Sequence, residues 1–350
     1  MKNYNRNNRK NKVPVKSLVF LLVALAFLAA VLLPIPYYVE GPGATIKLDE
    51  LITVNDRKDD HSGSFSLTSV GIRQATLVTA IKSKLTDFED LVTERELMGD
   101  ATDEEYDRIQ NYYMESSQNA AIEQALKLAG KPYKMHYLGV YVMGIDPSSN
   151  FYGKISVGDT VTKVDGKSFA TSDELVAYVH DQKVGQTVTV TYIQDDQEKE
   201  ATGKLISLPK PNEGKAGIGI TLTSHTEITS DEEIAFHIDN IGGPSAGLMF
   251  TLEIYQQLVN QDLRAGMAIA GTGTMNEAGL VGQIGGIDKK VASAAASGAK
   301  IFLAPKGETK ADTNYQEAKA AAKKLGTDMK IVPVATVEEA VAYLESLSEK

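Results

Sequence analysis

Two short stretches decide the fold of the C-terminal third of the chain: Ile241-Gly-Gly-Pro-Ser-Ala-Gly-Leu248 and Ile284-Gly-Gly-Ile-Asp-Lys-Lys290. The paired glycines let the backbone turn sharply, and a segment with helical periodicity follows each stretch. Ser245 and Lys290 are therefore predicted to lie at the starts of two helices. A serine and a lysine presented in this way are the parts of a Ser–Lys catalytic dyad, a variant of the serine hydrolase arrangement.

The position of Ser245 suits nucleophilic chemistry. The N-terminus of a helix offers unpaired backbone N–H groups and the positive end of the helix dipole, which stabilise a developing oxyanion. The N–H groups of Ser245 and of Gly242 or Gly243 are the candidate donors. The first stretch could also be an ordinary strand-to-helix turn.

Lys290 can act as a base only in its neutral form. A free lysine has a pKa near ~10.4, and burial in an apolar pocket lowers that pKa because the charged form loses its hydration. Thr272 ends a predicted strand and could donate a hydrogen bond near the lysine. The neighbouring Lys289 points about 100° away around the helix and is predicted to be solvated.

A Ser–His–Asp arrangement is the alternative chemistry. His237 and Asp239 precede the serine. His237, however, lies within an apparent strand over residues 234–238, where the alternation of residues favours a structural role.

Composition and charge exclude several classes of function. The chain has 350 residues, enough for two or three domains, and no cysteine, so disulfides, thiolate metal sites and a cysteine nucleophile are excluded. The first sixteen residues hold six of the 36 basic residues and none of the 46 acidic ones, so the remainder is strongly acidic. An acidic protein is not suited to bind nucleic acid, whose phosphates are negatively charged. We predict no metal, no cofactor and no nucleic-acid partner.

The N-terminal segment predicts a membrane anchor. Residues 17–35 carry no charge over about the length of one helical span. The basic segment 1–16 precedes the predicted span 17–36, which predicts a single-pass protein of the cell membrane. The positive-inside rule places its N-terminus in the cytoplasm and the residues after the span outside. The alternative is a cleaved signal peptide.

Residues 37–134 are predicted as an extracytoplasmic region of short strands followed by helices over 74–85 and 103–128. These helices could be a spacer or a lid beside a catalytic site. Both interpretations remain open.

Residues 135–208 read as strand, strand, turn, helix, strand, strand around Gly158-Asp-Thr-Val-Thr-Lys-Val-Asp-Gly166. This order and motif resemble a PDZ domain of the bacterial protease type. The resemblance implies that an extended peptide adds to a sheet edge near Leu138, Gly139 and Val140, and that its terminal carboxylate meets backbone N–H groups there. A small β domain that acts only as a spacer is the alternative. Residues 209–215 are a predicted linker.

Residues 216–350 are predicted as an α+β unit of peptidase size. The stretches around Ser245 and Lys290, together with Ala270-Gly-Thr-Gly273, resemble the proteolytic domain of Lon proteases over residues 216–347. The resemblance implies that Ser245 is the nucleophile, Lys290 the base and Thr272 the supporting threonine. Gly242 stands where the family has an acidic residue, and Gly-Thr-Gly stands where Lon has Thr-Gly-Glu.

Lon is usually driven by ATP, but this chain offers no phosphate-binding loop. The motif of such a loop needs a glycine five residues before Gly-Lys-Ser. At Gly166-Lys-Ser168 that position is occupied by Val161. The whole arrangement resembles the membrane-anchored PDZ–Lon peptidases of Gram-positive bacteria. That resemblance implies ATP-independent cleavage of exported or unfolded peptides, and ring-shaped homo-oligomers. The alternatives are a catalytically inactive membrane-anchored PDZ adaptor and a different serine hydrolase such as an amidase.

Overall fold

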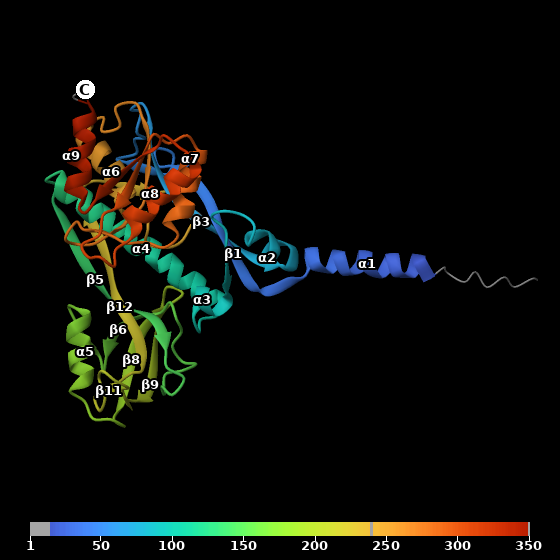
Figure 1. The fold of residues 1–350 in the computed structure, drawn as a ribbon. Helices are drawn as coiled ribbons and strands as arrows, with labels where there is room; N and C mark the ends of the chain where they lie inside the picture. The colour runs from blue at the N-terminus through green and yellow to red at the C-terminus, as the bar shows by residue number, and fades with distance from the viewer. Residues whose placement is uncertain (1–14, 239–240, 349–350) are drawn as a thin grey trace, which may run out of the picture. The chain divides into compact units, whose positions relative to one another are not determined.

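The computed structural model describes residues 15–238 and 241–348 (Figure 1). The chain divides into two compact units, one of residues 1–41 and 71–97 and the other of residues 42–70 and 98–350. The His237–Asp239 alternative falls partly outside the described residues, because Asp239 is not among them.

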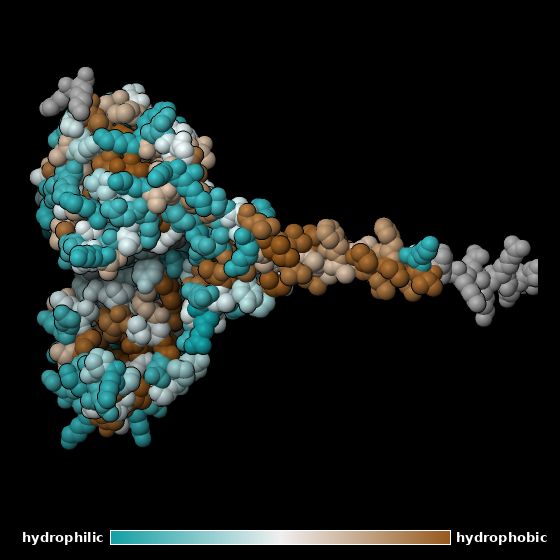
Figure 2. Space-filling view, viewed as in Figure 1, coloured by the Kyte–Doolittle hydropathy of each residue, from teal (hydrophilic) through white to brown (hydrophobic). Residues whose placement is uncertain are grey.

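The first unit contains helix α1 (Val15–Leu32), which is long and apolar enough to cross a membrane. None of its described residues is buried, and Figure 2 shows apolar side chains along its length. A signal sequence would have the same length and composition. The structure therefore supports one N-terminal apolar helix.

The rest of the first unit is a small cluster. The first half of β1 (Pro34–Lys47) pairs antiparallel with β4 (Asp90–Thr93), from Tyr37 opposite Thr93 to Glu40 opposite Asp90. The unit also holds α2 (Leu77–Ser83), and α3 (Glu94–Met98) follows β4. Thr76 caps α2 through its side-chain oxygen, which fixes where the predicted helix 74–85 begins.

The second unit contains the stretches around Ser245 and Lys290 together with a sheet. Its strand order is β18-β17-β14-β3-β1, and β14 (Ala268–Gly271) pairs in parallel with both β3 (Ser64–Thr76) and β17 (Ile301–Pro305). β17 pairs in parallel with β18 (Lys330–Val334). Every residue of β17 is buried, as expected for a parallel strand covered on both faces. The helices of this part are α6 (Gly247–Val259), α7 (Ile287–Ala296), α8 (Asn314–Leu325) and α9 (Val337–Ser348).

The core of the predicted domain 216–350 also includes residues that lie much earlier in the chain. β3 is the direct partner of β14, and Leu48, Phe65 and Leu67 belong to the same core as the helix that follows Ser245. The short strand β2 (Ile52–Val54), which precedes the PDZ-like segment, also pairs with β13 (Ile234–Phe236), which follows it. The PDZ-like segment therefore lies within this unit in sequence, between two parts of one core.

Helix α4 (Asp103–Leu128) is a single helix of 26 residues, as the periodicity predicts. Thr102 and Glu105 form a reciprocal capping box at its start. The helix packs against α6 and against strand β12 (Ile220–Ser230). The helix therefore packs within the second unit.

The PDZ-like segment forms a second sheet in the order β12-β5-β6-β8-β9, where β5 is Tyr133–Ile145. The segment has its own hydrophobic core, which includes Val140, Phe151, Val161 and Leu175. Asp165 and Gly166 both have positive φ, which makes the predicted tight turn. The predicted linker 209–215 is the loop of a small hairpin between β10 and β11. The other elements are β6 (Thr160–Val164), β7 (Lys167–Ser168), α5 (Ser172–His180), β8 (Thr187–Gln194), β9 (Gln197–Lys204), β10 (Ile206–Ser207) and β11 (Ala216–Gly217).

Candidate active site

The loop that carries Ser245 is tied to the end of β14. The carbonyl oxygen of Ser245 accepts hydrogen bonds from the Gly273 N–H, at 2.9 Å, and from Thr272 Oγ1, at 3.0 Å. The Leu248 N–H donates to the Gly273 carbonyl at 3.1 Å. A side chain at Gly273 would collide with Val281, since an added Cβ would lie 2.4 Å from Val281 Cγ1. These contacts fix Ser245 just before α6.

Lys290 lies in the first turn of α7, and its ammonium group reaches three oxygens. Nζ is 2.7 Å from Ser245 Oγ, 2.9 Å from the Thr68 carbonyl oxygen and 3.3 Å from Thr272 Oγ1. Lys290 is 3 % exposed and Thr272 is fully buried. The structure therefore brings together Ser245, Lys290 and Thr272, all named from the sequence, and adds Thr68 of β3.

Burial changes the chemistry of the lysine. Desolvation lowers the pKa of Lys290 from 10.5 to about 8, because the charged form loses its hydration. The neutral amine is then well populated near pH 8. With Ser245 Oγ at hydrogen-bond distance, that amine can accept the hydroxyl proton.

Helix α4 supports the other side of the serine loop. The Gly243 N–H donates to the Gln110 carbonyl at 2.9 Å, and Ser117 Oγ donates to the Pro244 carbonyl at 3.1 Å. A Cβ added at Gly242 would lie 2.7 Å from Gln110 Cβ. No local motif around Ser245 indicates this support, because α4 lies more than a hundred residues earlier.

The hydrogen bond between Gly243 and Gln110 removes one of the candidate oxyanion donors. In this conformation the Gly243 N–H is directed to Gln110, so Gly243 is not a free donor. The N–H groups of Ser245 and Gly242 remain the candidates.

Two further sequence-based predictions differ from the structure or stay open. Lys289 is 3 % exposed and not solvated; its Nζ lies 3.4 Å from Asp288 Oδ1, and its stem packs beside Gly286. His237 is exposed, and its backbone N–H donates to the Leu51 carbonyl at 2.8 Å. The side chain of His237 has no described contact with Ser245.

The predicted peptide edge of the PDZ-like sheet is already paired. Val140 is fully buried and lies opposite Ser224 of β12, and Gly139 lies opposite His225. Leu138 is 40 % exposed. Gly139 has φ +147°, and an added Cβ would lie 2.3 Å from the Val161 carbonyl oxygen, which explains the glycine. A peptide that approaches this edge therefore meets β12, because the backbone N–H and C=O groups of β5 are already paired with it.

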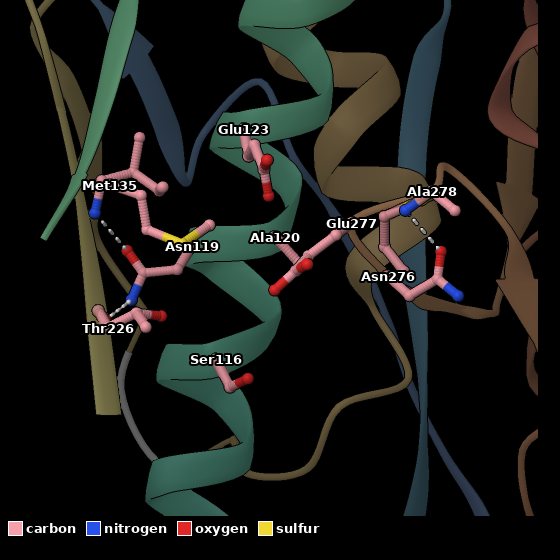
Figure 3. Close-up of a pocket in the computed structure, with 11 residues that line it drawn as sticks. Ser116, Asn119, Ala120, Glu123, Met135, Thr226, Asn276, Glu277 and Ala278 are labelled. Atoms are coloured by element: carbon pink, nitrogen blue, oxygen red, sulfur yellow. Dashed lines mark hydrogen bonds between the residues drawn. The ribbon is translucent and has the colours of Figure 1, made fainter. Parts of the chain in front are cut away.

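A polar cavity of about 480 Å³ lies between α4, the β5–β12 pair and the loop after Met275 (Figure 3). Burial and the nearby Glu277 carboxylate raise the pKa of Glu123, and the Tyr133 hydroxyl donates to Glu123 at 3.0 Å. Asn119 of the same wall is bonded to β12. Neither Ser245 nor Lys290 lines this cavity.

One group of side chains among the described residues has the spacing of metal ligands: Asp59, Asp60 and His61. The fully buried Arg264 lies 2.6 Å from Asp59 Oδ2, and His61 lies 2.7 Å from Asp59 Oδ1. A guanidinium already neutralises this carboxylate, so the group is an ion-pair cluster and does not favour a metal.

Two family models match separate segments of the second unit. Residues 123–205 match the PDZ domain family, and residues 215–345 match the Lon protease (S16) C-terminal proteolytic domain. The Lon protease of Ureaplasma parvum serovar 3 is 31 % identical over 125 residues, which are 35 % of this chain and 15 % of that protein. The chain thus matches less than a fifth of that relative's length.

Two solved PDZ domains are similar to part of this chain. The PDZ domain of an SdrC-like protein from Listeria monocytogenes is 39 % identical and covers 26 % of this chain and 93 % of its own, with a TM-score of 0.24. The corresponding domain from Listeria innocua is 38 % identical and covers 25 % of this chain and 96 % of its own, with a TM-score of 0.24.

The chain therefore joins a PDZ domain to a Lon-type proteolytic domain in one multidomain α+β protein with an N-terminal apolar helix. The second of these domains is a protease domain of the serine type.

Proposed function

We propose that the chain is an ATP-independent serine endopeptidase that uses a Ser245–Lys290 dyad. The observation that carries the proposal is the 2.7 Å distance between Lys290 Nζ and Ser245 Oγ, formed by a lysine that is 3 % exposed. Buried lysines with a lowered pKa are suited to act as general bases. An intact pair of this kind argues against the inactive PDZ adaptor.

The dyad accounts for both halves of peptide hydrolysis. Lys290 takes the hydroxyl proton while Ser245 Oγ bonds to the carbonyl carbon, and the N-terminus of α6 stabilises the oxyanion. The C–N bond then breaks, and the Lys290 ammonium returns its proton to the leaving amine. Water, activated by the same lysine, hydrolyses the acyl-enzyme and regenerates Ser245.

The N-terminal residues support a proposal for where the chain is located. We propose that the N-terminal apolar helix stays in the cell membrane as an uncleaved single span, with the basic segment 1–16 in the cytoplasm and the protease domain outside. Substrates would then be exported or unfolded peptides. A carbonate-washed membrane fraction that retains the chain with an intact N-terminus would support the anchor, and release of a shortened chain would support a signal peptide.

Activity should rise with pH. The neutral form of Lys290 is the active base, so below its pKa of about 8 the value of kcat/KM is expected to fall by about tenfold for each pH unit. Initial rates on a fluorogenic peptide between pH 6 and 10 measure this profile. Lys289→Met is the matched control and should keep the same apparent pKa. A profile that is flat from pH 6 to 10 would contradict a lysine base.

Ser117 should act as a positioning residue through the serine loop. Ser117→Ala removes the hydrogen bond to the Pro244 carbonyl, and we expect kcat to fall by about tenfold with KM and the apparent pKa unchanged. The control is Ser116→Ala on the same helix, which lines the polar cavity and should leave kcat unchanged. Equal kcat values for the two variants would show that this contact does not position the loop.

A further inference from the structure

Strand β12 lies where a bound peptide would lie. PDZ domains take an extended chain by adding it to a sheet edge. In this chain β12 runs antiparallel along β5, with Ile220 opposite Ile145 and Ser224 opposite Val140. Because β6 pairs with the other side of β5 at Val140, the segment of β5 that follows Gly139 has a neighbour on both sides.

The side chains of β12 also take the places of a ligand's side chains. Alternate residues of a strand face the same side. Ile220 and Leu222 pack against the PDZ core, which includes Leu175 of α5. Ser224 Oγ lies 2.8 Å from Ser172 Oγ at the start of α5. The strand thus contacts both β5 and α5, as a PDZ ligand does.

β12 is the edge strand of this sheet, and few of its side chains are buried. Among its eleven residues only Ile228 is buried, and the register to β5 shifts at two places. Its outer edge is covered by side chains of α4, not by another strand: Tyr112 Oη donates to the Ser224 carbonyl at 2.6 Å, and Asn119 Nδ2 donates to the Thr226 carbonyl at 3.0 Å. Segments with little buried apolar surface open locally at low cost.

We propose that β12 is a built-in ligand of the PDZ domain, and that an extended peptide enters this domain by displacing β12 from β5. Helix α4 contacts β12 through Tyr112 and Asn119 and the serine loop through Gln110 and Ser117, so displacement removes two contacts of the helix that supports Ser245. The proposal rests on the proposed function only for this second consequence; closure of the PDZ edge stands without it.

A disulfide can lock β12 in place. Gly144 lies opposite Thr221, and a Cβ added at Gly144 would lie 3.7 Å from Thr221 Cβ, within the range of a disulfide. Gly144 is not among the residues with positive φ, so a side chain is compatible with its backbone. The chain has no cysteine, so Gly144→Cys with Thr221→Cys gives one defined crosslink.

The test uses the full chain in detergent, with Ser245→Ala added so that the probe is not cut. The probe is a fluorescein-labelled synthetic peptide with the sequence of residues 218–230, and its binding is followed by anisotropy up to ~1 mM, since a tethered strand competes at an effective concentration of that order. We expect binding to the reduced double-cysteine variant and at least tenfold weaker binding after oxidation. Each single-cysteine variant should bind equally under both conditions.

Two outcomes would overturn the proposal: equal affinity of the reduced and oxidised forms, or no binding to the reduced form. The double-cysteine variant with Ser245 intact is assayed in parallel on a fluorogenic peptide. Loss of all hydrolysis in both redox forms and in the parent chain would refute the peptidase while leaving the binding result interpretable.

Discussion

Replacing Ser245 with alanine is expected to lower kcat for peptide hydrolysis by roughly four orders of magnitude or more, since no other group supplies the attacking oxygen. The hydroxyl is only partly buried, and the loop is fixed by backbone contacts of Ser245, Gly273 and Leu248 that alanine preserves. The variant should therefore fold normally. The measurement is single-turnover cleavage of a fluorogenic peptide by the full chain in detergent.

The control for this variant is its thermal unfolding midpoint, which should match that of the parent. Thr272 Oγ1 bonds to the Ser245 carbonyl and not to its side chain, so that bond is kept. Undiminished turnover by a folded Ser245→Ala chain would remove Ser245 from the mechanism.

Replacing Lys290 should be equally damaging. Lys290→Arg keeps a charge that cannot be lost near neutral pH, and Lys290→Met keeps the length of the side chain but has no base. Both are expected to lower kcat by about as much as Ser245→Ala, because nucleophile and base act as one unit. For the same reason Ser245→Ala combined with Lys290→Met should lose no further activity.

Stability gives the control for the methionine variant. The folded-state pKa of Lys290, about 8, is below its unfolded value of 10.5, so the unfolded chain binds more protons between these pH values. The destabilisation is complete below pH 8 and disappears as pH rises to 10.5. Lys290→Met should thus be most stable relative to the parent at pH 7 and less so at pH 10. Full activity of either Lys290 variant would contradict the dyad.

The sequence was sufficient to place Ser245 and Lys290 near the starts of two helices, because the signals for a helix start are local. Glycine-rich turns before two helical segments predict where Ser245 and Lys290 lie, and α6 and α7 begin within three residues of the predicted starts. Apolar alternation and the Asp165-Gly166 turn likewise predict the PDZ segment. Each of these signals lies within about a dozen residues.

The contributions that come from distant segments could not be predicted. Lys290 donates a hydrogen bond to the backbone carbonyl of Thr68. Since every residue has a backbone carbonyl, the residue type at position 68 gives no sign of this contact. Gln110 also acts through its backbone, and Ser117 is one serine on a long helix. The closed PDZ edge depends on β12 pairing with β5 across some eighty residues, which strand periodicity alone does not determine.

We propose above that Ser245 and Lys290 cleave peptides without ATP. The most direct test incubates the full chain in detergent, without nucleotide, with a mixture of unfolded proteins, beside Ser245→Ala, and identifies fragments by mass spectrometry. We expect fragments from the parent chain and none from the variant. Identical fragments from both, or fragments from the parent only when ATP is added, would contradict it.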